Sequence, residues 1–479
     1  MAKLTLNQMM LLGGIGTIVI IFLAMMNWRR AVYAAMVAAL FEGAIRKWIF
    51  PQGSELVYFL KDIILLGAYI KFYMFPDPDI RAYRLKIPTT LIIVVCVTLV
   101  VTGALNPNLG SLLMAGYGLK IYLWYFPLAF MVPMLFRSEE EMTKMLFRYT
   151  LFAIPICLLG AAQFVAGPGS WLNVYAESAF AQMKTVATFG SALQQTVRIT
   201  GTFSFISGHA TFIQFFFVLA LGLLTGIADK RRLVIMFGVL PLIVANGLMA
   251  GSRGAVFSMM LIGAAVGSVS SVSRLGKTKG SFIFLAMGAA AVALGIFVFF
   301  EKAYTAFETR RATTGDTTMG RVMYPITSVL AASKEVDIAG FGIGTSHPAT
   351  MAMRSALGIP QPKKSCPLYD SETGQVLGEL GWPGFIMWYA LRLMIVFHCW
   401  DAFRRSPPSL FKSLALGIFC FQVLLLPSSM VLNHTANLFA CAGWGFCLIP
   451  RLESLVNRRV GQAVGRRSFN APSGRHHPA

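Results

Sequence analysis

The chain has 479 residues, of which 56% are hydrophobic and only 13% are charged. Soluble proteins carry about 25% charged residues, so this composition excludes an ordinary soluble domain and indicates an integral membrane protein. The formal net charge of +21 suggests nucleic-acid binding, but the distribution of that charge along the chain argues against this class.

The apolar residues form long runs, each long enough for about 20 residues of membrane-spanning helix. The predicted spans, about 12–13 in all, are 9–27, 31–47, 56–75, 87–104, 117–136, 146–166, 209–226, 231–248, 254–270, 282–300, 380–399, 411–427 and 434–450. The first run is too long for a signal peptide and lacks a small-residue cleavage site, so we expect it to remain as a span.

Basic residues concentrate in alternate short loops and in the C-terminal tail. Examples are Arg29–Arg30, Lys230–Arg232 and Arg404–Arg405, whereas the intervening loops 105–116 and 428–433 carry almost no charge. By the positive-inside rule, this asymmetry predicts a multi-pass protein with a cytoplasmic C-terminus. The basic excess therefore indicates topology, and we expect no nucleic-acid partner.

The same pattern divides the chain into a transmembrane domain, 1–450, and a basic cytoplasmic tail, 451–479, which we predict to be disordered. The transmembrane domain includes a first sizeable extracytoplasmic loop, 167–208, and a large, partly helical extracytoplasmic loop, 301–379. A loop of the latter length in a compact bundle is usually functional. We therefore expect 301–379 to be the catalytic loop.

Of the seven cysteines, only Cys366 falls outside the predicted spans, so the sequence predicts no disulfide framework. The cysteine spacings match no metal site. We expect neither a metal nor a cofactor.

The second and third spans carry charged residues near the turn that joins them. Glu42 and Arg46 are four residues apart, one helical turn, and Lys61 and Asp62 lie about one turn inside the third span. Charges at that depth normally face protein or water, so these four residues are predicted to form one network. A structural ion-pair cluster and a substrate-binding role are both open.

Two further arginines lie at predicted outer turns. Arg198 precedes a hydroxyl-rich segment that leads to Gly208 and a helix N-terminus, where backbone N–H groups favour anions. The alternative is an interfacial turn with a snorkelling arginine. Arg253 is the only charge on the tight turn Ala250–Ala255, against the topological bias, which favours a functional role.

Within the large loop, Thr318–Glu335 has helical spacing, with Arg321 at its N-terminal end as a candidate anion site. The run Gly340–Gly344 predicts a tight turn with exposed backbone amides. His347 is interpreted as either a surface histidine or a catalyst.

Two acidic residues, Asp370 and Glu372, precede the next span, where helix capping is the default role. Arg392, deep in that span, is expected to snorkel.

These motifs, taken in order, resemble the O-antigen ligase and polymerase superfamily of bacterial membrane glycosyltransferases, in particular its exopolysaccharide-polymerase-like members. The residues that carry the resemblance are Ser252–Ala255, Gly320–Arg321, Gly340–Gly344 and Glu372–Gly381. Glu42–Pro51 and Arg198–Gly208 are similar to features of the polymerase-like subset.

The resemblance implies an all-helical, GT-C-like bundle in the bacterial inner (cytoplasmic) membrane and a metal-independent, inverting glycosyl transfer. The donor would be a glycan on undecaprenyl pyrophosphate and the acceptor a second lipid-linked glycan, with polysaccharide export or chain-length proteins as further partners. The family's ligases carry a histidine followed by asparagine where this chain has Asp370 and Ser371. That departure favours a polymerase.

Such a reaction needs cations for the leaving pyrophosphate and at most one general base. We expect the pyrophosphate to be bound by Arg253 and Arg321, then Arg198 and Arg46, because a guanidinium binds phosphate in a bidentate manner. Glu372 is the first candidate base, with Asp370 and His347 next. The alternatives are a transporter of lipid-linked sugars and a non-catalytic scaffold of an export complex.

Overall fold

The computed structural model describes residues 6–274 and 318–469, apart from 82–84, 86, 88, 176–185, 192–193, 228, 348–349, 351–352, 356–357, 361, 363, 365, 368, 370, 408 and 429. The predicted span 282–300 and residues 301–317 lie outside the described residues. So do residue Asp370 and the side chain of Arg321, whose backbone is part of a helix.

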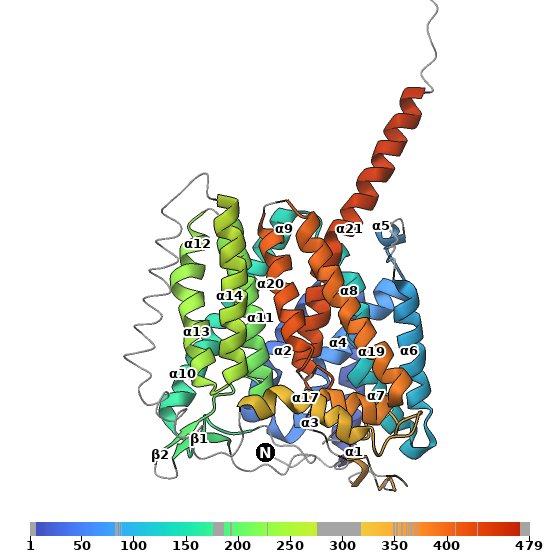
Figure 1. The fold of residues 1–479 in the computed structure, drawn as a ribbon, viewed down its shortest axis with the longest axis vertical. Coiled ribbons are helices and arrows are strands. Elements are labelled where there is room, and N and C mark those ends of the chain that lie inside the picture. Colours follow the sequence, from blue (N-terminus) through green and yellow to red (C-terminus); the bar gives the residue numbers. More distant parts are fainter. Residues whose placement is uncertain are drawn as a thin grey trace, which may run out of the picture.

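The described chain forms a bundle of helices (Figure 1). Its longer helices are α1 (Leu6–Met26), α2 (Trp28–Ala44), α4 (Leu60–Tyr69), α6 (Thr90–Ala104), α7 (Leu112–Leu123), α9 (Glu139–Leu151), α10 (Ala153–Ala166), α11 (Ile206–Gly226), α13 (Leu240–Met249), α14 (Arg253–Arg274), α17 (Thr318–Ala332), α19 (Glu372–Arg405), α20 (Leu410–Leu425) and α21 (His434–Phe469). Shorter elements are α3 (Ser54–Tyr58), α5 (Pro78–Arg81), α8 (Phe126–Met131), α12 (Arg231–Leu233) and the antiparallel hairpin β1 (Thr188–Ser191) and β2 (Gln194–Val197). A short π-helix, Ile45–Ile49, extends α2.

The long apolar helices confirm the prediction of an α-helical membrane protein. In lipid the backbone N–H and C=O groups of a spanning segment must bond to each other, which a helix achieves. Among the described residues, four helical stretches are long and apolar enough to cross a membrane: Glu139–Ala166, Ile206–Gly226, Arg231–Met249 and Glu372–Arg405. Shorter apolar helices accompany them, including Thr90–Ala104 and Leu410–Leu425. The predicted span 117–136 is broken, since α7 ends at Leu123 and α8 begins at Phe126.

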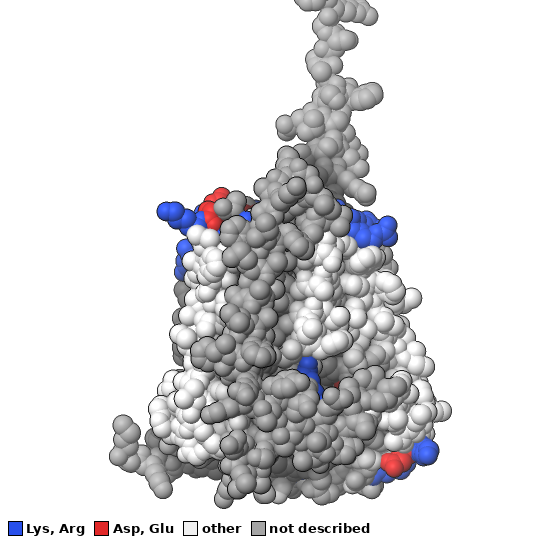
Figure 2. Space-filling model, turned by 60° about the vertical axis from the view of Figure 1, so that its left-hand side comes forward, with Lys and Arg blue, Asp and Glu red and all other residues white. Residues whose placement is uncertain are grey.

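The two ends of the bundle differ. The helix α17 lies across one end of the bundle, and the β1–β2 hairpin lies at the same end (Figure 1). The helix α21 extends out of the opposite end. On the face drawn in Figure 2, most described charged side chains lie near these two ends, and an uncharged band separates them. The helix α21 continues to Phe469, into the segment that the sequence analysis expects to be a disordered tail. Arginine, which favours helix, is the most frequent residue of 451–469.

A bend in α19 accommodates the large loop. Gly381 has φ 66° and ψ −175° within the helix, and Pro383 follows it. A Cβ at Gly381 would lie 1.9 Å from the carbonyl oxygen of Ile338, so only glycine allows this approach. Just before the bend, the Gly378 carbonyl of α19 accepts a hydrogen bond from the amide of Phe341 (2.8 Å). The glycine run therefore packs directly on α19.

The carboxylate of Glu379 fixes this loop. It accepts hydrogen bonds from the amides of Gly344 (2.8 Å) and Ser346 (3.1 Å), from Ser346 Oγ (2.5 Å) and from the hydroxyl of Tyr122 (2.8 Å). The expectation of exposed amides in Gly340–Gly344 is therefore wrong for Gly344, whose amide binds the protein's own carboxylate. Because Glu379 is fully buried, these bonds join α7, α19 and the loop.

We predict that Glu379→Gln destabilises the fold. Glutamine has no charge, and its NH₂ group would face the N–H and O–H groups that now donate to the Glu379 carboxylate. A hydrogen bond to a charged group contributes about 1.5–3 kcal/mol, so the unfolding free energy of the detergent-purified protein should fall by at least that amount. The exposed Glu335→Gln variant is the control and should change it by less than about 0.5 kcal/mol. Equal stability of the two variants would contradict this role.

Candidate functional site

Charged side chains from α2 and its π-helical extension, α4 and α7 meet inside the bundle. We call six of them the buried charge cluster, and each exposes at most 8% of its surface: Glu42, Arg46, Lys47, Lys61, Asp62 and Lys120. Ionisable groups at such positions are rare in membrane proteins and usually mark a functional site. The cluster is therefore the strongest candidate site in the described part of the chain.

Ion pairs connect the cluster. Lys61 Nζ donates to Glu42 Oε2 (2.6 Å), and Arg46 Nη1 lies 3.8 Å from Glu42 Oε1. Asp62 Oδ2 lies 3.9 Å from Lys61 Nζ and 2.9 Å from Lys120 Nζ. The predicted network of Glu42, Arg46, Lys61 and Asp62 is thus confirmed as a structural feature.

Lys120 is a member that the sequence analysis missed. Its ammonium group lies 4.1 Å from the ring centroid of Tyr58 and 4.3 Å from that of Phe59, which adds cation–π attraction to the ion pair with Asp62. A lysine inside the apolar run 117–136 was the available signal, because a charge at that depth requires a partner.

The segment 198–208 covers the cluster. Arg46 donates to Ser204 Oγ (2.9 Å), and Lys47 Nζ donates to Thr200 Oγ1 (2.7 Å). Gly43 permits this contact, because a Cβ there would lie 2.3 Å from the Ser204 nitrogen. The hydroxyl-rich motif therefore binds cationic side chains of the second span.

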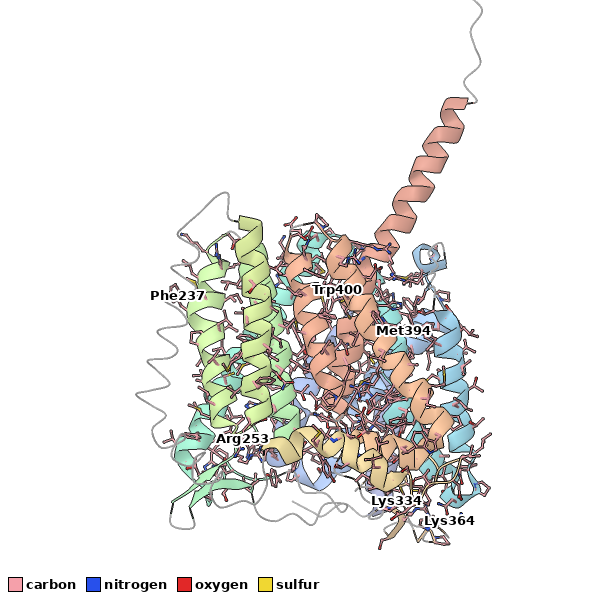
Figure 3. All side chains as sticks on the ribbon, viewed as in Figure 1. Phe237, Arg253, Lys334, Lys364, Met394 and Trp400 are labelled. Atoms are coloured by element: carbon pink, nitrogen blue, oxygen red, sulfur yellow. The ribbon has the colours of Figure 1, made fainter. Side chains whose placement is uncertain are left out.

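The other end of this segment reaches the turn that contains Arg253. Arg198 Nε donates to the carbonyl of Ala250 (3.4 Å), and Arg253 begins α14. Figure 3 shows Arg253 at the end of the bundle where α17 lies. The structure thus links Arg46, Arg198 and the Arg253 turn through one continuous segment. Arg321 belongs to α17, at the same end.

The buried charge cluster holds more positive than negative charge. Its four basic side chains face two carboxylates, which leaves a formal surplus of two positive charges. A buried charge without a counter-charge is strongly unfavourable. An anion placed beside the cluster would therefore be bound favourably.

A cavity of about 130 Å³ adjoins the cluster. Glu42, Arg46 and Lys61 line it, together with Ser204, Asn433 and His434 and the aromatic rings of Tyr58, Phe203 and Phe205. A water molecule occupies about 30 Å³ in the liquid, so the cavity has room for a larger group such as a phosphate. Cationic, hydroxyl and aromatic groups on its wall suit a phosphate joined to a sugar.

The first candidate base, Glu372, has a different environment. Its side chain is fully buried, forms an ion pair with Arg392 and accepts hydrogen bonds from the amides of Met430 and Val431, the latter at 2.7 Å. Arg392 was expected to snorkel, but this expectation is wrong, because its guanidinium is paired with Glu372 inside the protein. It also donates to the Leu425 carbonyl. Because Arg392 and two backbone amides already occupy the oxygen lone pairs of Glu372, this carboxylate is better suited to hold segments together than to accept a proton.

This anchor nevertheless shapes the cavity. Met430 and Val431 directly precede residues 432–435, which line it. Glu372 therefore positions the cavity wall from α19, and a substitution there would alter the site without direct contact with a substrate.

His347 lies beside the cluster. Its Nδ1 is 3.3 Å from the hydroxyl of Tyr117, and its ring centroid is 6.1 Å from that of His434. Burial, with a smaller contribution from the charge of Lys120, lowers the pKa of His347 to about 4. The imidazole is therefore neutral at neutral pH. Asp370 lies outside the described residues.

Comparison of the sequence with models of known protein families gave no match, and neither did comparison with curated proteins.

We predict that Glu372 and Arg392 are strongly coupled in stability. Removing one partner of a buried ion pair costs about 3–5 kcal/mol, because the other charge remains buried. The unfolding free energy should fall by about that amount in Glu372→Leu and in Arg392→Met. In the double variant it should fall by less than the sum of the two. A double-mutant cycle on the unfolding free energies of the purified proteins measures this coupling.

Additive losses would contradict the ion-pair anchor. So would a Glu372→Gln protein that keeps wild-type stability, because removing the charge of one partner of a buried ion pair should destabilise the protein.

Proposed function

We propose that this protein is a glycosyltransferase that polymerises undecaprenyl-pyrophosphate-linked glycan repeat units at the outer face of the bacterial inner membrane. The product would be a surface polysaccharide or an exopolysaccharide, and polymerisation is favoured over ligation to a different acceptor. The buried charge cluster and its cavity would bind the pyrophosphate of a lipid-linked glycan.

The observation that carries this proposal is the surplus of positive charge beside a cavity lined by Arg46 and Lys61. A pyrophosphate diester is doubly negative, so its entry would neutralise the surplus. The guanidinium of Arg46 already donates to Ser54 and Ser204, which hold its plane in place. A preorganised guanidinium is well suited to a phosphate oxygen.

The reaction requires little else. The hydroxyl oxygen of the acceptor sugar attacks the anomeric carbon of the donor, the bond from that carbon to the pyrophosphate oxygen breaks, and the lipid pyrophosphate leaves with the electron pair. Negative charge develops on the leaving group, and fixed cations stabilise it where water is excluded. The lipid tail of the donor would remain in the bilayer.

The arginines that the sequence analysis selected complete the proposal. Arg198 and the Arg253 turn join the cluster through the segment 198–208 and are proposed to contact the donor where its glycan leaves the cavity. Arg321 on α17 is proposed to approach the donor from the large loop.

We predict that Arg46→Lys lowers chain growth strongly. Lysine keeps the charge but loses the planar fork, and removing one preorganised donor from a charge-stabilising site typically costs about 10²–10³ in rate. The assay uses purified protein in detergent and the lipid-linked glycan extracted from cells that lack this protein. Lys144→Met, which removes a half-exposed lysine of α9, is the control and should keep wild-type rates.

Absence of chain growth by the wild-type protein, together with movement of the same lipid across vesicle membranes, would replace the transferase by a transporter. Full activity of Arg46→Lys would remove the cluster from the proposed site.

A further inference from the structure

A second histidine, His434, lines the cavity and has no role in the proposal so far. It is the first residue of α21, and its two ring nitrogens are inaccessible to solvent and have no hydrogen-bond partner among the described residues. The nearby His347, in contrast, contacts the Tyr117 hydroxyl through Nδ1. A buried polar group without a partner costs about 1–3 kcal/mol, so such a group in a cavity wall points to a ligand that supplies the partner.

Rings rather than hydrogen bonds hold the imidazole. Its centroid lies 5.5 Å from that of Tyr58, edge to face, and 6.1 Å from that of His347. Because no hydrogen bond to a described residue fixes the tautomer or the ring angle, His434 can turn a nitrogen toward a bound sugar without breaking one.

The surroundings keep this imidazole neutral. Burial disfavours the charged ring, and the ammonium groups of Lys120 and Lys61 and the positive N-terminal end of α21 add to this effect. A neutral imidazole has a free lone pair. Glu42, the carboxylate on the same cavity wall, is already paired with Lys61 and lies near Arg46, so its lone pairs are less available.

We propose that His434 is the general base of the transfer, an inference that rests on the proposed function. A ring nitrogen of His434 takes the proton of the acceptor hydroxyl while the hydroxyl oxygen bonds to the anomeric carbon. The bond from that carbon to the pyrophosphate oxygen breaks at the same time, and the electron pair leaves with the lipid pyrophosphate. The imidazolium then returns its proton to the released pyrophosphate or to water.

The buried charge cluster makes proton transfer to His434 follow the binding of the donor. With the cavity empty, the surrounding cations oppose a proton on His434. A bound pyrophosphate cancels their charge and lies close enough to stabilise the imidazolium. The base is therefore strongest when the donor is present, which is when the acceptor hydroxyl must lose its proton.

The test compares His434→Ala and His434→Gln with wild type in two measurements. The first is the affinity of the purified proteins for undecaprenyl pyrophosphate, and the second is the rate of chain growth on lipid-linked glycan from cells that lack this protein. A general base is worth about 10²–10⁴ in rate, so both variants should lose that much while binding stays within about threefold of wild type. Added imidazole should restore part of the rate of His434→Ala only. His398→Gln, a histidine bonded to Thr89 and Trp444 away from the cavity, is the control.

Chain growth by both variants within about threefold of wild type would overturn the role of His434 and leave the transferase intact. Loss of undecaprenyl pyrophosphate binding in both variants, with no rescue by imidazole, would make His434 a structural wall residue and equally overturn it. A wild-type protein that binds the lipid but grows no chain would instead refute the proposed function.

Discussion

A charge buried in an apolar bundle requires a partner, and this constraint organises the described structure. Glu372 is paired with Arg392 and two backbone amides, Glu379 holds the amides of the glycine run, and Asp62 is paired with Lys120. Each pairing joins segments that are distant in sequence. In the buried charge cluster the four basic side chains outnumber the two carboxylates, and Arg46 and Lys61 of this cluster line the cavity.

The two carboxylates of α19 have separate structural effects on this site. Glu379 fixes the loop that carries His347, and Glu372 fixes the residues directly before Asn433 and His434. The bend at Gly381 lets one helix make both contacts and continue as an apolar span. The proposed chemistry therefore depends on residues that would never touch a substrate, which separates the anchoring role of α19 from binding and proton transfer.

The sequence predicted an α-helical membrane protein and the pair of Glu42 and Arg46, because helical periodicity and an i, i+4 spacing are local properties. It could not assign Lys120 to the network, since the partner Asp62 lies on another helix and only packing brings them together. The same limit applies to the two glutamates of α19: both precede or begin an apolar helix, but the groups that meet them come from residues 344–346 and 430–431. His434 carried no signal beyond its place at the start of the last predicted span.

The most direct test is an experimental structure, by electron cryomicroscopy, of the protein with an undecaprenyl-pyrophosphate-linked glycan bound. The account predicts that density for the two phosphates lies in the cavity, in contact with Arg46 and Lys61, and that the sugar at the anomeric carbon lies beside His434. Phosphates bound elsewhere, with the cavity empty and the buried charge cluster unchanged, would contradict it.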